Sequence, residues 1–229
     1  MTTQGEEADL ATLYSQTDLI QGMIATELPG GPAWHPANGD PLDKLPALTD
    51  GIGVRATGLT GLLNDFPGPG VPAISIQYDL QTAVDIAEID VFSGNNGRDG
   101  RAFHTYTVSF SSDNAGTWSE PIYVQSHLSG TVNSNGFRVA LTQLTDTSGT
   151  LAADVTNLQF GFYAVDNTGG QMQDPFVGVN PLNGLDDGFT EAFVSPLIWE
   201  IDVVAVPEPL SIMLVGFGGL LIRRRHMNR

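Results

Sequence analysis

The 229-residue sequence contains no cysteine. Disulfides, thiol nucleophiles and Cys-ligated zinc are therefore excluded, and stability must come from a packed core. Basic residues are also scarce, with nine lysines and arginines against 26 acidic residues and a formal net charge of −17. So acidic a chain repels nucleic acid and anionic membranes, and we expect no nucleic-acid partner. The charge suits either a solvated, soluble surface or the binding of cations.

Motifs of catalysis are missing as well. The sequence has neither a Gly-x-Ser-x-Gly elbow nor a His-Glu-x-x-His pair, and its four histidines are scattered along the chain. A glycosidase needs two carboxylates at a fixed separation, which any acidic chain can meet in three dimensions. The sequence thus favours a non-enzymatic protein, with a secreted polysaccharide-active hydrolase as the alternative.

From residue 71 onward, apolar residues recur at every second position, as in a half-buried strand. This alternation predicts strands at Ala73–Leu80, Val84–Phe92, Thr105–Phe110, Ile122–Gln125, Phe137–Leu141, Leu158–Val165 and Trp199–Val204. Loops rich in Gly, Asn, Asp and Ser separate these strands, and no helical period lies between them. The pattern predicts an all-β fold, an antiparallel β-sandwich or jelly roll.

The first 42 residues give a weaker pattern. Met1–Leu28 is compatible with a helix, while Asp18–Ala25 within it is equally compatible with a first strand. Five prolines and three glycines between Pro29 and Pro46 predict an irregular surface loop. We therefore divide the chain into an N-terminal segment and loop packing on the sandwich (1–42), a β-sandwich domain (43–205) and a tail (206–229).

The tail joins three unlike parts. A proline-rich joint, Pro207-Glu208-Pro209, is followed by the uncharged run Leu210–Ile222 and then by the cluster Arg223, Arg224 and Arg225. The run predicts one hydrophobic helix about 20 Å long, which is short for a membrane span of about 30 Å. By the positive-inside rule, the arginines would stay in the cytoplasm and place the body across the membrane.

This order of parts resembles the PEP-CTERM sorting signal of bacterial surface proteins. The resemblance implies export, transient anchoring in the membrane, and processing near Pro-Glu-Pro by an exosortase-type membrane protease. The body would then reach the cell surface or the extracellular matrix, where polysaccharide is an expected partner. Members of that family start with a secretory signal peptide, whereas this sequence starts with the acidic stretch Met1–Asp9, so we expect a further segment upstream.

The body is similar in order and spacing to galactose-binding-like (discoidin-type) jelly rolls. The resemblance rests on Leu48–Gly51, Ile74–Leu80, Ile89–Asn95, Tyr106–Asp113 with Trp118, Leu158–Tyr163 and Trp199–Val203. It implies an eight-stranded sandwich whose end loops can bind glycans. Many members also hold a structural Ca²⁺ where an Asp-Gly turn meets a Glu of the last strand, which maps onto Asp50 and Glu200. Alternatively, Asp50 caps a turn before Gly51 and Glu200 faces solvent.

Three loop residues are candidates for ligand binding. Trp34 either stacks on a sugar face or anchors its loop to the core. Arg98 and Arg101 lie in a Gly/Asn-rich loop, where they either meet an anionic sugar or neutralise local carboxylates. We expect Trp118 and Trp199 to cover the sandwich core.

Overall fold

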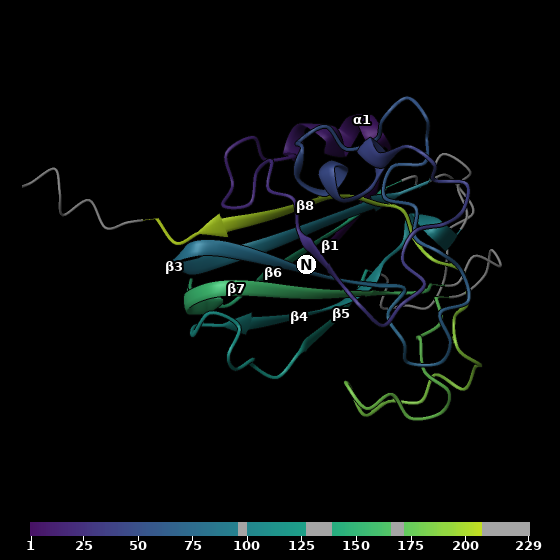
Figure 1. Ribbon diagram of the computed structural model, residues 1–229. Helices are drawn as coiled ribbons and strands as arrows, with labels where there is room; N and C mark the ends of the chain where they lie inside the picture. Colours follow the sequence, from purple (N-terminus) through teal and green to yellow (C-terminus); the bar gives the residue numbers. More distant parts are fainter. Residues whose placement is uncertain (96–99, 127–138, 166–171, 208–229) are drawn as a thin grey trace, which may run out of the picture.

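The computed structural model describes residues 1–95, 100–126, 139–165 and 172–207, which form antiparallel strands joined by loops and single-turn helices (Figure 1). The strands are β1 (Thr2–Gly5), β2 (Thr26–Leu28), β3 (Ile74–Gly94), β4 (Thr105–Ser111), β5 (Ile122–Gln125), β6 (Val139–Thr145), β7 (Ala152–Tyr163) and β8 (Ile198–Ala205). The helical turns are α1 (Glu7–Leu10), η1 (Ala11–Leu13), η2 (Pro41–Asp43), η3 (Leu45–Thr49) and η4 (Gly100–Ala102). The predicted all-β class is confirmed.

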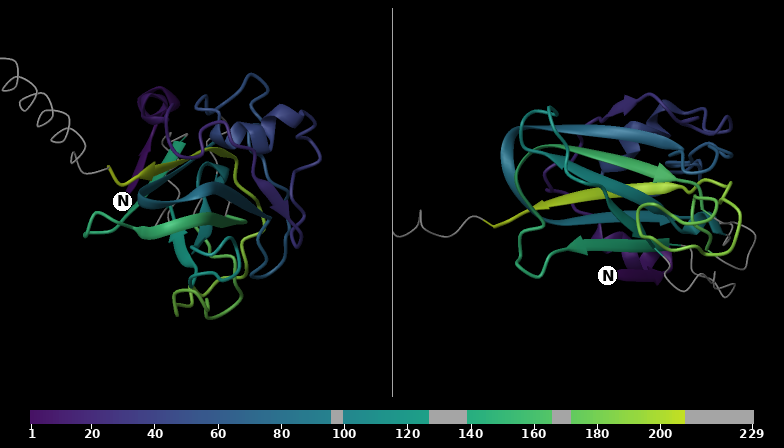
Figure 2. Two further views of the ribbon diagram at one scale, coloured as in Figure 1. Left: turned by 60° about the vertical axis from the view of Figure 1, so that its left-hand side comes forward. Right: turned by 90° about the horizontal axis from the view of Figure 1, so that it is seen from below.

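The 21-residue strand β3 belongs to both layers of the sandwich. Its first half pairs with β2 and β7, whereas its second half pairs with β6 and β8. β1 extends one layer beyond β6, and β4 and β5 extend the other beyond β7. The views in Figure 2 show the sheet curling over so that the two layers face each other.

The alternation predicted two strands where the structure has the single strand β3. Gln81 has a left-handed backbone (φ 65°) and donates its N–H to Asp79 Oδ1, so the chain turns sharply there. The pairing with β7 shifts register between Asp79 and Val84, which is the signature of a β-bulge. The bulge bends the strand from one layer to the other without ending it.

The other predicted strands match closely or differ at their ends. β4, β5 and β8 start and end within one residue of the prediction, whereas β7 starts at Ala152 rather than Leu158. β6 continues to Thr145 where the prediction stops at Leu141. Residues 137 and 138 lie outside the described residues, as does the helix predicted for 210–222.

The N-terminal segment follows neither of the two expected patterns. β1, α1 and η1 use residues 2–13, and Asp18–Ala25 forms turns rather than a strand. β1 pairs with β6, so this segment contributes a strand to the sheet. No helix among the described residues is long and apolar enough to cross a membrane.

The two larger apolar clusters of the described residues lie on opposite faces of one layer. The main core lies between the layers and includes Ile76, Tyr106, Phe160 and Ile201, all fully buried. The second cluster lies on the outer face of the β6–β3–β8 layer, where Leu10 and Tyr14 cover Phe92 and Trp199. Trp199 is therefore buried under the N-terminal segment rather than in the space between the layers.

Candidate functional site

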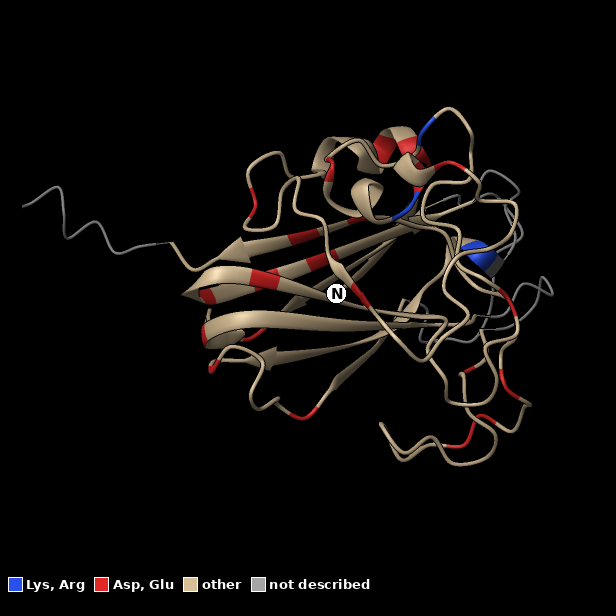
Figure 3. Ribbon diagram, viewed as in Figure 1, with Lys and Arg blue, Asp and Glu red and all other residues tan. Residues whose placement is uncertain are grey.

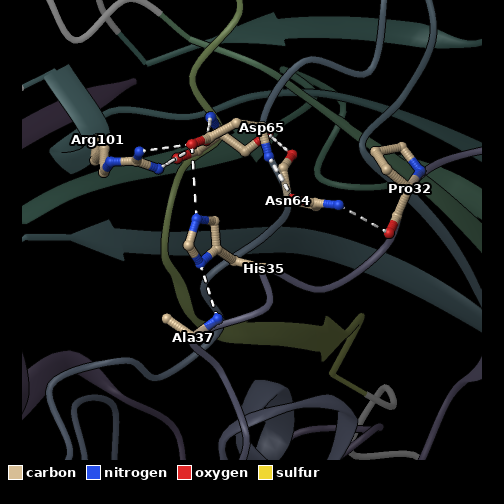
Figure 4. Close-up of polar contacts among 7 residues, drawn as sticks. Pro32, His35, Ala37, Asn64, Asp65 and Arg101 are labelled. Carbon is tan, nitrogen blue, oxygen red and sulfur yellow. Dashed lines mark hydrogen bonds and ion pairs between the residues drawn. The ribbon is translucent and has the colours of Figure 1, made fainter.

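Long loops gather at the end of the sandwich where β3 ends and β4 begins, shown at the right of Figure 1. Three separate loops supply an ion-pair network there, which is drawn in Figure 4. Arg101 donates from both terminal nitrogens to the two carboxylate oxygens of Asp65, each at 2.9 Å. Arg101 also donates to the Ser195 carbonyl at 2.9 Å, and the Ser195 N–H donates to Asp65 Oδ1 at 2.9 Å. The network ties together the loops that precede β3, β4 and β8.

Asp65 is ionised in this network. Burial acts to raise its pKa, but the Arg101 guanidinium and the Ser195 N–H outweigh it and hold the pKa below its usual value. His35 lies 3.8 Å from the same carboxylate through Nε2, and its Nδ1 accepts the Ala37 N–H (Figure 4). His35 Nδ1 therefore acts as the acceptor, and Nε2 faces Asp65.

Two phenylalanines form an apolar platform next to this network. Phe66 and Phe193 stack with ring centroids 5.3 Å apart and planes 14° from parallel. Phe66 is 73% exposed and Phe193 is 37% exposed. Phe66 has a left-handed backbone (φ 57°), which is uncommon for a bulky residue, and its N–H bonds to the Phe193 carbonyl. The fold thus holds an aromatic ring in solvent beside fixed polar groups.

Of the three predicted ligand-binding residues, one lies in the loop network, one anchors its loop to the core, and one is outside the described residues. Arg101 lies in the centre of the loop network. Trp34 packs against the main core, and its indole N–H donates to Glu27 Oε2 at 2.8 Å, an arrangement that anchors its loop. Arg98 lies outside the described residues.

The sequence reasoning missed Asp65, Phe66 and Phe193 as site residues. For Phe66 the sequence did hold a signal. A phenylalanine in the Gly/Pro-rich stretch 64–70 is not part of an alternating strand pattern, which indicates an exposed aromatic ring in a loop. For Asp65 the sequence offered nothing, because its partner Arg101 is 36 residues away and the pairing depends on the fold.

A second group of polar residues lies on the outer face of the β6–β3–β8 layer, beside the second apolar cluster. We name Asp18, Asp90, Glu200 and Asp202 the β8 acid cluster, and Figure 3 shows the acidic positions on β3 and β8 side by side. Glu200 and Asp202 are 0% and 1% exposed, with the Asp50-Gly51 turn against Glu200 and Ser15 of the N-terminal segment against Asp202. Asp202 lies directly opposite Asp90 across the sheet. The alternative in which Glu200 faces solvent is wrong.

Backbone N–H groups satisfy only part of this cluster. Ser15 N–H donates to Asp202 Oδ2 at 2.8 Å, and Gly51 N–H donates to Glu200 Oε2 at 2.9 Å. Asp18 Oδ1 accepts from Ile20 N–H at 2.9 Å. One oxygen of each member is buried and has no hydrogen-bond partner among the residues that the structure describes: Asp18 Oδ2, Asp90 Oδ1, Glu200 Oε1 and Asp202 Oδ1.

The pKa values follow from this burial. Burial, and then the charges of Asp202 and Asp50, raise the pKa of Glu200 to about 9. Burial also raises the pKa of Asp202 to about 6 and raises that of Asp18. Burial and the adjacent Glu88 raise the pKa of Asp90. At neutral pH, Glu200 is therefore protonated in the folded protein.

The predicted calcium pair is brought together, although Asp50 is already engaged. Gly51 N–H contacts Glu200, so the Asp-Gly turn does meet the last strand. However, Asp50 Oδ2 is bonded to Arg55 at 2.6 Å and Asp50 Oδ1 accepts from Ile52 N–H at 2.9 Å. Glu200 Oε1 is the oxygen left for a metal, and no group of three or more His, Cys, Asp and Glu in the described part of the chain could hold one. The residues therefore fit calcium only in part.

One histidine lies beside a serine in the interior. His104 Nδ1 is 2.6 Å from Ser93 Oγ, and both residues are 0% exposed. The Ser93 hydroxyl donates to the Ala102 carbonyl at 2.8 Å, so the imidazole does not take its proton. Burial lowers the pKa of His104 to about 3. The hydrogen-bonding groups of His104 and Ser93 are thus satisfied within the fully buried interior, away from any substrate.

Comparison with known proteins adds only a structural likeness. No protein-family model matches the sequence, and no curated protein matches it. Among solved structures, the chain is similar to CpGH89CBM32-6 and CpGH89CBM32-4, both produced by Clostridium perfringens. The identities are 13% and 14%, the alignments cover 82% of this chain and 99% and 98% of the other chains, and the TM-scores are 0.39 and 0.42. At this level, the likeness says nothing about what this chain binds.

Proposed function

We propose that this chain is a non-enzymatic glycan-binding protein of a bacterial cell surface or extracellular matrix. The observation that carries the proposal is the exposed Phe66–Phe193 platform beside the Asp65–Arg101 network. An aromatic face stacks on the apolar face of a sugar ring, and fixed carboxylate and imidazole groups accept or donate hydrogen bonds to its hydroxyls. Arg101 acts mainly on Asp65, which it holds ionised and correctly placed.

The network favours binding over cleavage. Hydrolysis of a glycosidic bond needs a general acid and a second carboxylate on either side of the bond. Asp65 is bonded to Arg101 through both oxygens and its pKa is lowered, so it is a poor proton donor. Glu200 and Asp202, two of the acids with raised pKa values, are fully buried. A polysaccharide-active hydrolase is therefore the alternative that the assay below must exclude.

We expect the full-length chain to bind a subset of glycans on an array and to release no product from them. The array hits should be incubated with the protein and examined for new reducing ends. Turnover of any polysaccharide would contradict the non-enzymatic assignment, and the absence of binding would contradict glycan recognition.

Export through the tail is the second part of the proposal. The last strand ends at Ala205, Val206 N–H bonds to the Asp85 carbonyl, and Pro207 is exposed. The sandwich is thus complete directly before Pro207-Glu208-Pro209, where an exosortase-type protease would cut. We expect mass spectrometry of the mature protein to show a C-terminus near this joint. A mature chain that retains Arg223–Arg225 would contradict processing.

Calcium at Asp50 and Glu200 stays a prediction. An ion there would use Glu200 Oε1 and carbonyl oxygens of the Asp-Gly turn, and Arg55 would have to release Asp50. If calcium binds, EDTA lowers the thermal midpoint of the protein. An unchanged midpoint would remove both residues from consideration.

A further inference from the structure

A cavity of about 440 Å³ opens at the end of the sandwich opposite to the Arg101 network. It lies beyond the end of β4 and beside the start of β7, whereas Arg101 precedes the start of β4. The seven residues of β4 at about 3.3 Å each separate the two places by roughly 20 Å. The cavity is therefore physically separate from the proposed glycan site.

The lining of this cavity has an apolar floor and a polar rim. Four side chains make the floor: Phe110, Ile122, Leu151 and Val155. Trp118 is half-buried in the wall, and Ser112, Thr117 and Glu120 are exposed on the rim. Trp118 was expected to cover the core; in the structure it is half-buried and borders this cavity.

The loop that carries Trp118 is held rigidly. Asp113 accepts hydrogen bonds from Ser111 Oγ, Thr117 N–H and Thr117 Oγ1, each at 2.8 Å. On the other side of the indole, Ser119 N–H bonds to the Phe110 carbonyl, and Phe110 N–H bonds to Ser119 Oγ. The backbone on both sides of Trp118 is thus held in place, and the indole is carried on an ordered loop.

The free polar groups of the rim identify the chemistry of a ligand. Ser112 Oγ and the Glu120 carboxylate have no hydrogen-bond partner within the described residues, so a hydroxyl acceptor and a carboxylate acceptor remain available. No lysine or arginine lines the cavity, and the chain carries a net charge of −17. An anionic ligand would be repelled, and a wholly apolar one would leave the rim unsatisfied.

We propose that the Trp118 cavity binds one ring of a neutral saccharide. The apolar face of the ring stacks on the indole, and its hydroxyls donate to Glu120 and exchange hydrogen bonds with Ser112 and Thr117. The volume falls in the range of small-molecule sites, about 300–1,000 Å³. This site does not depend on the Phe66 platform, and the two together would let one chain contact two places on a polymer.

The test uses the full-length chain carrying Phe66→Ser, so that the loop-end platform does not contribute. Calorimetric titration with cellobiose, lactose, mannobiose and chitobiose should show saturable binding of at least one disaccharide. Adding Trp118→Ala should weaken this binding about tenfold, which corresponds to about 1.4 kcal/mol, because the sugar ring loses the indole on which it stacks. Glu120→Gln should weaken it several-fold, and because Glu120 is exposed, this variant should fold normally.

Two outcomes would overturn the Trp118 site. One is the absence of binding of all four disaccharides in the Phe66→Ser background, and the other is equal binding with and without Glu120→Gln. If the wild-type chain binds glycans and Phe66→Ser abolishes this binding, the result would support the Phe66 platform alone. Failure of the Trp118 site is thus distinguishable from failure of the proposed function.

Discussion

The free energy of unfolding should fall steeply as the pH rises from about 5 to about 8, the reverse of the usual behaviour of paired carboxylates. The cause is the β8 acid cluster. Glu200 has a pKa of about 9 when folded against a model value of 4.5, so the unfolded chain releases its proton several pH units earlier. Asp202, with a pKa of about 6, also lowers the free energy of unfolding as the pH rises.

The sign follows from proton binding. Between the unfolded and folded pKa values, the folded state holds more protons than the unfolded state, so each pH unit costs about 1.4 kcal/mol of stability per group. The stabilisation is complete below the unfolded value and is lost as pH rises through the folded value. Asp65 has the opposite effect on stability. Because its pKa is lowered in the folded state, its contribution to the free energy of unfolding is lost as the pH falls into the acidic range. Maximum stability should therefore lie near about pH 5.

Thermal melts in EDTA should show a midpoint roughly 10 °C lower at about pH 8 than at about pH 5. Glu200→Gln should reduce this dependence and raise the midpoint at the higher pH, because the amide cannot ionise and still accepts the Gly51 N–H, while Asp90 and Asp202 continue to titrate. Glu120→Gln, at an exposed position, is the matched control and should keep the wild-type slope. A midpoint that is flat or rises over this range would show that the cluster does not titrate as described.

Arg101→Ala should lower the free energy of unfolding by about 2–4 kcal/mol, the second large effect. The substitution removes two hydrogen bonds from the Asp65 carboxylate, which is only 17% exposed, and one from the Ser195 carbonyl. The loop before β4, which carries Arg101, then loses its side-chain bonds to the loops before β3 and β8. Urea denaturation monitored by tryptophan fluorescence measures the loss.

Two variants sharpen this experiment. Arg101→Met combined with Asp65→Asn should recover part of the stability, because no buried charge is left without a partner. Lys44→Ala is the control, since Lys44 forms no ion pair within the described residues. If Arg101→Ala and Lys44→Ala have equal, small effects, the network contributes nothing measurable to the fold.

Local pattern was enough to predict most of the strands. β4, β5 and β8 were located within a residue because each has one face against the core, and side chains in a strand alternate between faces. The continuity of β3 was not predictable, since the polar, bulged stretch around Gln81 looks like a break. A bulge and a loop have similar residues, and only pairing with the neighbouring strands distinguishes them.

The polar sites depended on contacts distant in sequence. The meeting of the Asp50-Gly51 turn with Glu200 was foreseen through a family resemblance, 149 residues apart along the chain. The burial of Glu200 and Asp202 was not foreseen, because it requires the Asp50-Gly51 turn and Ser15 to cover the outer face of β8. A carboxylate on a strand reads as solvent-facing unless the covering segment is known.

The central claim, glycan recognition at the Phe66 platform, is tested most directly by titration of an array hit into three chains. The wild-type protein should bind, and Phe66→Ser should weaken binding about tenfold or more without changing the thermal midpoint, because Phe66 is 73% exposed. Val177→Ser, at a residue that is 60% exposed and outside the platform, should bind like the wild type. Equal affinity of Phe66→Ser and wild type would contradict the assignment of the site.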